Sequence, residues 1–232
     1  MKKIFDIFEI EYTNIDLEYI DELINYLKNN YKRIMVFFGI KTFKEKIKIK
    51  IWNNVEEYRN YFNTIYKKYG YNKTVPSWEM ARVFTDTSPK IFLISYKESL
   101  KCKGHQKDDL NKYLKVILHE FVHTCQFEFN NHNESLTWLN EALATTLSHQ
   151  YDNYPLTLDV SLDSIINGQA SYINYYTMGK YLINNYSKEY ILELAKNREL
   201  LTKDTSKIYE ETLLYINNRK ISDINGKTNK IN

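Results

Sequence analysis

The first part of the chain mixes a helical pattern of apolar residues with a strand pattern. From Asn14 to Tyr31, apolar residues recur every three or four positions, which predicts a helix. Residues 46–51 then alternate lysine with isoleucine, which predicts a strand with one buried face and one lysine face. A capping pattern at Asn54 predicts a second helix, which ends at Gly70.

The later pattern is helical almost throughout. Two short strands, residues 80–84 and 90–96, are predicted first, and a turn at 85–89 joins them. Beyond them, helices are expected at about 108–130, 135–150, 171–186, 188–197 and 205–220. Strands and helices followed by helices alone indicate an α+β fold. We expect a small mixed sheet with helices packed on it, and then a mostly helical half.

The domain organisation predicted from this pattern is simple. No repeat and no linker rich in proline or glycine divides the chain, so one domain over residues 1–224 is predicted. Its α/β part reaches about residue 105, and its helical part begins at about residue 106. The polar residues 225–232 are predicted to form a disordered tail.

Charge and cysteine content narrow the class of protein. The 232 residues include 32 basic and 29 acidic ones, mixed along the chain, for a net charge of +3. That balance does not favour nucleic acid or an anionic membrane as a partner. The only two cysteines, Cys102 and Cys125, are typical of a reduced compartment rather than of a disulfide framework. The N-terminus acquires acidic residues too early for a signal peptide, and no apolar run is as long as a membrane span, so a cytoplasmic protein is expected.

The segment Val116–Cys125, VILHEFVHTC, carries the candidate chemistry. Residues four apart on a helix share one face, so His119 and His123 can direct ring nitrogens to one point, as Zn²⁺ requires. Glu120 lies about 100° around the helix. From there its carboxylate can take a proton from a water at the metal and return it to a leaving amine.

The alternative is a packed helix that carries two hydrogen-bonded histidines. The chain has only five histidines, so an HExxH pattern seldom arises by chance. The residues around it from Val116 to Cys125 are otherwise uncharged, as expected of a helix buried beneath a metal site. The pattern therefore favours one bound zinc ion.

A third protein ligand is expected, because catalytic zinc sites use three and leave the fourth position open. The candidates are Glu128, His132, Glu134, Glu141 and His149. Glu128 is turned well away from His123 on the same helix, and His132 does not fit the HExxHxxGxxH spacing. Glu141 lies in the apolar segment WLNEALA, where a carboxylate without a partner would be costly. A metal would account for it, and so would a salt bridge.

With these residues the chain resembles the gluzincin zinc peptidases. HEFVH followed by WLNEALA is similar to the HExxH and WLNEGFA elements of the aminopeptidase N family and to small bacterial peptidase-MA-like domains. The resemblance covers roughly residues 75–186. It implies a zincin-like fold, with His119, His123 and Glu141 as zinc ligands and Glu120 as general base.

The resemblance also implies an oxyanion donor. The segment Tyr176-Thr177-Met178-Gly179 resembles a Tyr-x-x-Gly element whose tyrosine stabilises the negative charge that develops on the substrate carbonyl. Tyr176 is the expected catalytic residue, with Tyr172 and Tyr175 as competitors.

Departures from the family pattern shape the expected function. Ala142 replaces the usual glycine, and no GxMEN element precedes the metal helix; Trp78-Glu79 is only a similar pair in another order. An endopeptidase acting on peptides or proteins is therefore favoured over an aminopeptidase. By analogy, the strand at residues 91–95 would lie at the sheet edge and pair with substrate; the alternative is an ordinary strand of the sheet. The alternatives are a zinc-stabilised binding module without catalysis and a zinc hydrolase acting on another kind of amide.

Overall fold

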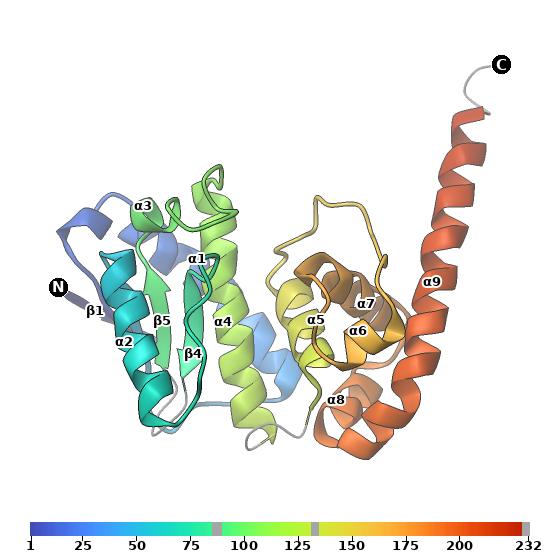
Figure 1. Ribbon diagram of the computed structural model, residues 1–232, viewed down its shortest axis with the longest axis horizontal. Coiled ribbons are helices and arrows are strands. Elements are labelled where there is room, and N and C mark those ends of the chain that lie inside the picture. The colour runs from blue at the N-terminus through green and yellow to red at the C-terminus, as the bar shows by residue number, and fades with distance from the viewer. Residues whose placement is uncertain (85–89, 131–134, 229–232) are drawn as a thin grey trace. The chain divides into compact units, whose positions relative to one another are not determined.

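The computed structural model describes residues 1–84, 90–130 and 135–228, with side chains up to residue 219. The chain forms two compact units, Met1–Phe129 and Asn130–Asn232. The first contains a small mixed sheet with helices, and the second is helical (Figure 1). The predicted α+β class is thus confirmed. The boundary between the units falls after residue 129, inside the helical part that we predicted to begin at about 106. The predicted turn at 85–89 lies outside the described residues.

Five strands form the sheet of the first unit. They are β1 (Lys2–Phe5), β2 (Phe8–Glu11), β3 (Ile47–Trp52), β4 (Ala81–Phe84) and β5 (Lys90–Ile94). Their order is β1-β2-β3-β5-β4; β2, β3 and β5 are parallel, and the two outer strands run antiparallel to their neighbours. The predicted strands correspond to β3, β4 and β5, whereas β1 and β2 were not predicted. The expectation that residues 91–95 form the edge is wrong, because β5 pairs with β3 on one side and with β4 on the other.

The core of this unit lies on the isoleucine face of β3. Ile47, Ile49 and Ile51 are each buried, and each contributes about 1.5–3 kcal/mol by leaving water. On the same unit, the ring of Phe121 in the HEFVH segment lies 5.4 Å from that of Phe8 in β2. Phe121, which lies between the two histidines in the sequence, therefore packs their helix against the sheet.

The helices of the first unit begin where side chains cap them. They are η1 (Asn14–Asp16), α1 (Ile20–Phe38), α2 (Val55–Lys68), α3 (Tyr96–Ser99) and α4 (Leu110–Asn130). The Asn54 side chain accepts from two amides of the first turn of α2, as predicted. The helix predicted from Asn14 begins only at Ile20, because the buried Asp16 carboxylate accepts from Thr13 N at 2.7 Å and closes a separate 3-10 turn.

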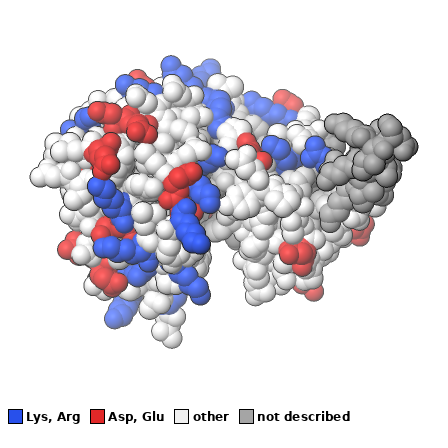
Figure 2. All heavy atoms as spheres, turned by 90° about the horizontal axis from the view of Figure 1, so that it is seen from above, with Lys and Arg blue, Asp and Glu red and all other residues white. Residues whose placement is uncertain are grey.

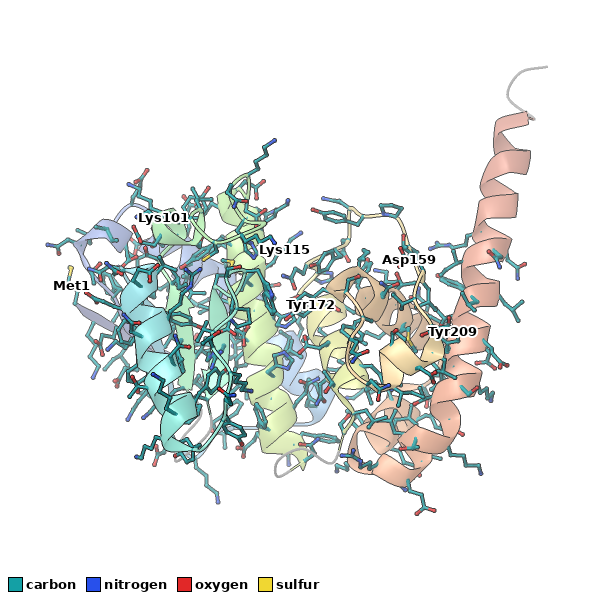
Figure 3. All side chains as sticks on the ribbon, in the orientation of Figure 1. Met1, Lys101, Lys115, Asp159, Tyr172 and Tyr209 are labelled. Atoms are coloured by element: carbon teal, nitrogen blue, oxygen red, sulfur yellow. The ribbon has the colours of Figure 1, made fainter. Side chains whose placement is uncertain are left out.

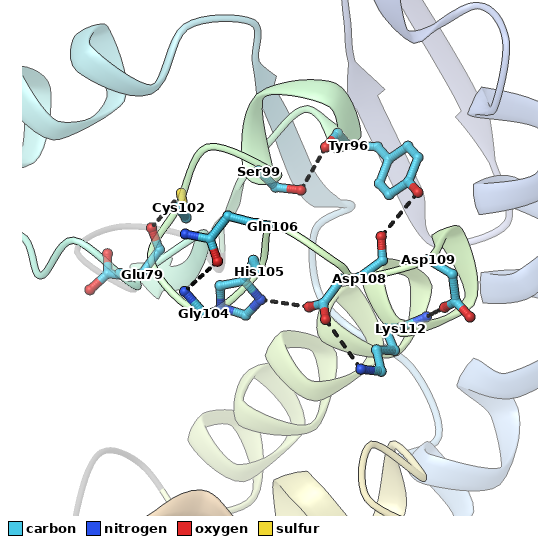
Figure 4. A network of polar contacts seen from close by, with 10 residues as sticks. All are labelled: Glu79, Tyr96, Ser99, Cys102, Gly104, His105, Gln106, Asp108, Asp109 and Lys112. Carbon is cyan, nitrogen blue, oxygen red and sulfur yellow. Dashed lines mark hydrogen bonds and ion pairs between the residues drawn. The ribbon is translucent and has the colours of Figure 1, made fainter.

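A polar network holds the start of α4, the helix with the two histidines (Figure 4). Asp109 Oδ1 accepts from Lys112 N at 2.8 Å and caps the helix. Asp108 contacts His105 Nδ1 at 2.7 Å and Lys112 Nζ at 3.3 Å, and its carbonyl accepts from the Tyr96 hydroxyl at 3.1 Å. His105 therefore has a structural partner in the loop before α4.

The second unit is built from helices alone in its described part. They are α5 (Thr137–Leu147), α6 (Leu162–Ile166), α7 (Tyr172–Asn185), α8 (Lys188–Lys196) and α9 (Arg198–Thr228). The fully buried Trp138 of α5 donates to Thr205 Oγ1 of α9 at 3.2 Å. The short α6 was not predicted, α9 begins before residue 205, and it includes residues 225–228 of the tail predicted to be disordered.

The sequence predicted mixed surface charge and no membrane-spanning segment. In Figure 2, basic and acidic side chains interleave over the face shown. Among the described residues, no helix is long and apolar enough to cross a membrane.

Candidate metal site

The two histidines of α4 converge as the helical spacing predicts. His119 Nε2 lies 3.0 Å from His123 Nε2, and the two rings are nearly perpendicular. Two nitrogen ligands of a tetrahedral zinc ion lie about 3.3 Å apart, given Zn–N bonds of about 2.0–2.1 Å. The observed separation is close to that value. It also suits a hydrogen bond between the rings, which is the alternative considered above.

Gln126 sets the tautomer of His123. Its amide Oε1 lies 2.7 Å from His123 Nδ1, and because an amide oxygen only accepts, the proton of the ring lies on Nδ1. A lone pair is then left on Nε2, the nitrogen that faces His119, which is the arrangement of a metal-binding histidine. Gln126 was missed in the sequence, although its place three residues after His123 on one helix face is a usable signal.

Glu120 is buried beside the pair, with 8% of its surface exposed. Its surroundings include Tyr58 of α2, which is fully buried. Burial raises the pKa of the Tyr58 hydroxyl well above its ordinary value, and the charges of Glu79 and Glu120 raise it further.

Glu141 lies in α5 of the second unit, half-buried among apolar neighbours. Burial raises the pKa of Tyr175, a residue of α7, and the negative charge of Glu141 raises it further. The Tyr175 hydroxyl accepts from Ala170 N at 3.1 Å, which leaves its own proton available for donation.

Three residues meet the requirement for a metal-binding group. One ligand atom from each of His119, His123 and Glu141 lies within 4.8 Å of the other two. Two imidazoles and a carboxylate are a donor set that zinc accepts, so the residues present fit the ion. Among the other candidates, His149 Nδ1 lies 2.7 Å from Asp152 Oδ2. Glu128 does not join the group within the described part of the chain, and His132 and Glu134 lie outside it.

Tyr176, the expected oxyanion donor, has a hydrogen-bond partner in the structure. Its hydroxyl donates to Asp152 Oδ1 at 3.0 Å, and Asp152 also pairs with Lys180 Nζ at 3.5 Å. Burial and the neighbouring Asp152 raise the pKa of Tyr176. Burial, and to a lesser extent the charge of Glu141, raises the pKa of Tyr175, one of the two named competitors. Tyr172 occupies the first turn of α7 (Figure 3).

The glycine of the Tyr-x-x-Gly element has a packing role. A Cβ on Gly179 would lie 2.3 Å from Ala142 O and 2.4 Å from Thr146 Oγ1, distances that no packed side chain adopts. Glycine thus lets α7 approach α5 directly beside Glu141. The element supports the position of the helix that carries the third candidate ligand.

Glu79 precedes the edge strand β4 and is fully engaged. Its Oε1 accepts from the Tyr58 hydroxyl at 2.8 Å and from Arg82 Nε at 2.7 Å, and its Oε2 accepts from Arg82 Nη2 at 2.6 Å. The guanidinium of Arg82 also stacks 4.3 Å above the ring of Phe62. Arg82 therefore already compensates the charge of this carboxylate.

Comparison with models of protein families, with curated proteins and with solved structures finds no significant match to this chain. The resemblance to gluzincin peptidases therefore stays a prediction.

Proposed function

We propose that this chain is a zinc metallopeptidase that hydrolyses internal peptide bonds. The proposal depends on one observation above all. Ligand atoms of His119, His123 and Glu141 come together beside the buried Glu120 carboxylate. A carboxylate next to two imidazoles and a third ligand is the arrangement that metal-assisted hydrolysis uses.

His119, His123 and Glu141 would hold the ion. Zinc, when bound, supplies a Lewis acid that polarises the substrate carbonyl and lowers the pKa of a water. Glu120 takes a proton from the attacking water as its oxygen bonds to the carbonyl carbon. It then gives that proton to the amine nitrogen as the C–N bond breaks, so that an acid and an amine leave. Gln126 keeps the lone pair of His123 on the nitrogen that faces the site.

Tyr175 is the donor that we propose for the oxyanion, in place of Tyr176. Burial and the charge of Glu141 raise the pKa of Tyr175. The Tyr175 hydroxyl accepts from Ala170 N, and this contact does not use the proton of the hydroxyl. The Tyr176 proton is already donated to Asp152. A phenol that is free to donate near the third ligand suits a developing negative charge.

Two features of the first unit favour an endopeptidase. Recognition of a free α-amine needs an available carboxylate, whereas both oxygens of Glu79 accept from Arg82. In addition, β4 is one of the two edge strands of the described sheet, and Arg82 lies opposite Phe92 of β5 in register. Ile94 N donates to Met80 O, so by the alternation of an antiparallel pair Ala81 and Val83 turn their backbone groups away from β5. Those groups can pair with an extended substrate.

The test compares Glu120→Gln with Glu128→Gln, a matched change two turns along the same helix. Both variants should bind stoichiometric zinc by metal analysis, because neither residue is a proposed ligand. Cleavage of a quenched fluorescent peptide library should fall at least about 10²-fold in Glu120→Gln only, the effect of losing a general base. Equal activity in Glu120→Gln and the parent protein would refute the mechanism.

A zinc-stabilised binding module without catalysis is the second candidate. It is favoured by the engagement of the Tyr176 hydroxyl with Asp152, since the donor expected for the oxyanion is occupied. Both candidates predict bound zinc that is lost in His123→Ala. Only a peptidase predicts cleavage that stops when a chelator removes the ion and returns when zinc is added back.

A further inference from the structure

The outer face of β3 is open over part of the sheet. β3 has parallel neighbours on both sides, β2 and β5, and parallel strands are usually covered on both faces. α2 covers one end of this face, where the Tyr61 ring lies 5.3 Å from Trp52 and the Phe62 ring lies 5.0 Å from Phe92. Beyond that end a groove of about 270 Å³ remains, and Lys48, Lys50 and Lys90 line it.

Two of these lysines face each other and make no ion pair within the described chain, although Lys48 also lies opposite Glu9 of β2 in register. Lys48 lies directly opposite Lys90 in the register of β3 and β5, and like charges in this position repel. The acidic residues of the groove are already paired: Glu9 with Lys2 at 2.7 Å, and Glu11 with Lys50 at 3.8 Å. Within the described chain, neither Lys48 nor Lys90 has a carboxylate within 4.0 Å. An anion between the two ammonium groups would relieve the repulsion.

Aromatic rings form the neighbouring wall of the groove. Tyr61 is 43% exposed, and its ring also lies 6.0 Å from that of Phe92. The Lys50 ammonium lies 4.2 Å above the Trp52 ring, so that face of the indole is occupied. Tyr61 therefore offers the accessible ring surface on which a flat ligand could stack.

We propose that this groove binds a small ligand in which a phosphate or carboxylate is attached to a flat ring. The anionic group lies between Lys48 and Lys90, and the ring packs against Tyr61. The groove belongs to the first unit alone and uses none of the residues of the candidate metal site. Ligand binding in the groove can therefore be tested independently of the proposed peptidase activity.

Isothermal titration calorimetry on the full chain tests it with three probes. Adenosine 5′-monophosphate has a phosphate and a flat ring, benzoate has a carboxylate on a ring, and inorganic phosphate has the anion alone. We expect saturable binding of at least one ring-bearing probe, tighter than that of inorganic phosphate. Whichever ring-bearing probe binds more tightly shows whether the groove prefers a phosphate or a carboxylate. Either preference supports the proposal.

Variants locate the binding. Lys48→Gln combined with Lys90→Gln should weaken that binding at least about tenfold, as expected for lost hydrogen bonds to a charged group. Lys48→Arg combined with Lys90→Arg keeps both charges and should retain it. Tyr61→Ala should weaken the ring-bearing probe only, and Lys203→Gln, an exposed lysine of α9, controls for net charge. Circular dichroism checks that each variant is folded.

Three results would overturn the proposal. One is the absence of saturable binding for every probe at millimolar concentration. Another is unchanged affinity in the double glutamine variant. The third is inorganic phosphate binding as tightly as the ring-bearing probes, which would remove the role assigned to Tyr61.

Discussion

Replacing Gly179 by alanine tests how closely α7 must approach the helix that carries Glu141. The added Cβ would lie 2.3 Å from Ala142 O and 2.4 Å from Thr146 Oγ1. Non-bonded atoms of this kind normally lie at about 3.5 Å, so the two helices must separate by about 1 Å. The hydroxyl of Thr146 can rotate away, but the carbonyl of Ala142 belongs to the helix backbone and cannot.

The cost follows from that separation. A gap of about 1 Å forfeits up to about half of the dispersion energy of each contact along the two helices. We therefore expect Gly179→Ala to lower the free energy of unfolding by about 3 kcal/mol, at the upper end of the range for overpacked cores. For a chain of this length, the midpoint of thermal unfolding should fall by roughly 6–12 °C. Zinc affinity should also fall, because Ala142 is adjacent to the proposed ligand.

Urea unfolding followed by circular dichroism measures the change, with the midpoint and the slope fitted separately. Asn185→Ala, an exposed position at the end of the same helix, is the control and should change stability by less than about 0.5 kcal/mol. Adding Thr146→Ala to Gly179→Ala should recover less than half of the loss, since the clash with the backbone remains. A Gly179→Ala protein as stable as the control would refute the packing argument.

Three further results are expected. Gln126→Leu should lower zinc affinity about 10–100-fold in a competition assay with a chromogenic chelator, because the histidine tautomer is no longer held; unchanged affinity would contradict the role of Gln126. Tyr175→Phe should reduce kcat on the best peptide of the library about 10²-fold with little change in KM, whereas Tyr176→Phe should chiefly lower stability; the reverse pattern would return the oxyanion role to Tyr176. Burial and the hydrogen bond to Glu211 raise the pKa of Tyr181 from 10.0 to about 12, so its neutral form is favoured in the folded state. The neutral Tyr181 hydroxyl therefore stabilises the folded state fully below pH 10, and this stabilisation is lost as the pH rises towards 12. The free energy of unfolding, measured over this pH interval, should fall less steeply in Tyr181→Phe than in the parent protein.

The sequence alone determined the features that depend on near neighbours along the chain. Two histidines four residues apart in an apolar helix must share a face, and the structure brings their Nε2 atoms to 3.0 Å. The strand at residues 46–51 and the cap at Asn54 follow from the same kind of local rule, namely the alternation of a strand and a side chain that accepts from the first turn. The contact of Gln126 with His123 is also a local feature, because it is made within one turn of α4.

Only the tertiary structure decided the features that join distant segments. The order of strands is one: β5 is internal because β4, which precedes it in the chain, pairs on its outer side. The engagement of Glu79 by Tyr58 is another, since that hydroxyl comes from α2. Tyr175 and Tyr176 are adjacent in the sequence, and only the packing of α7 gives their hydroxyls different partners, Ala170 N for one and Asp152 for the other. Local backbone geometry fixes which residues share a face, whereas the partner of each face depends on how the whole chain buries its apolar surface.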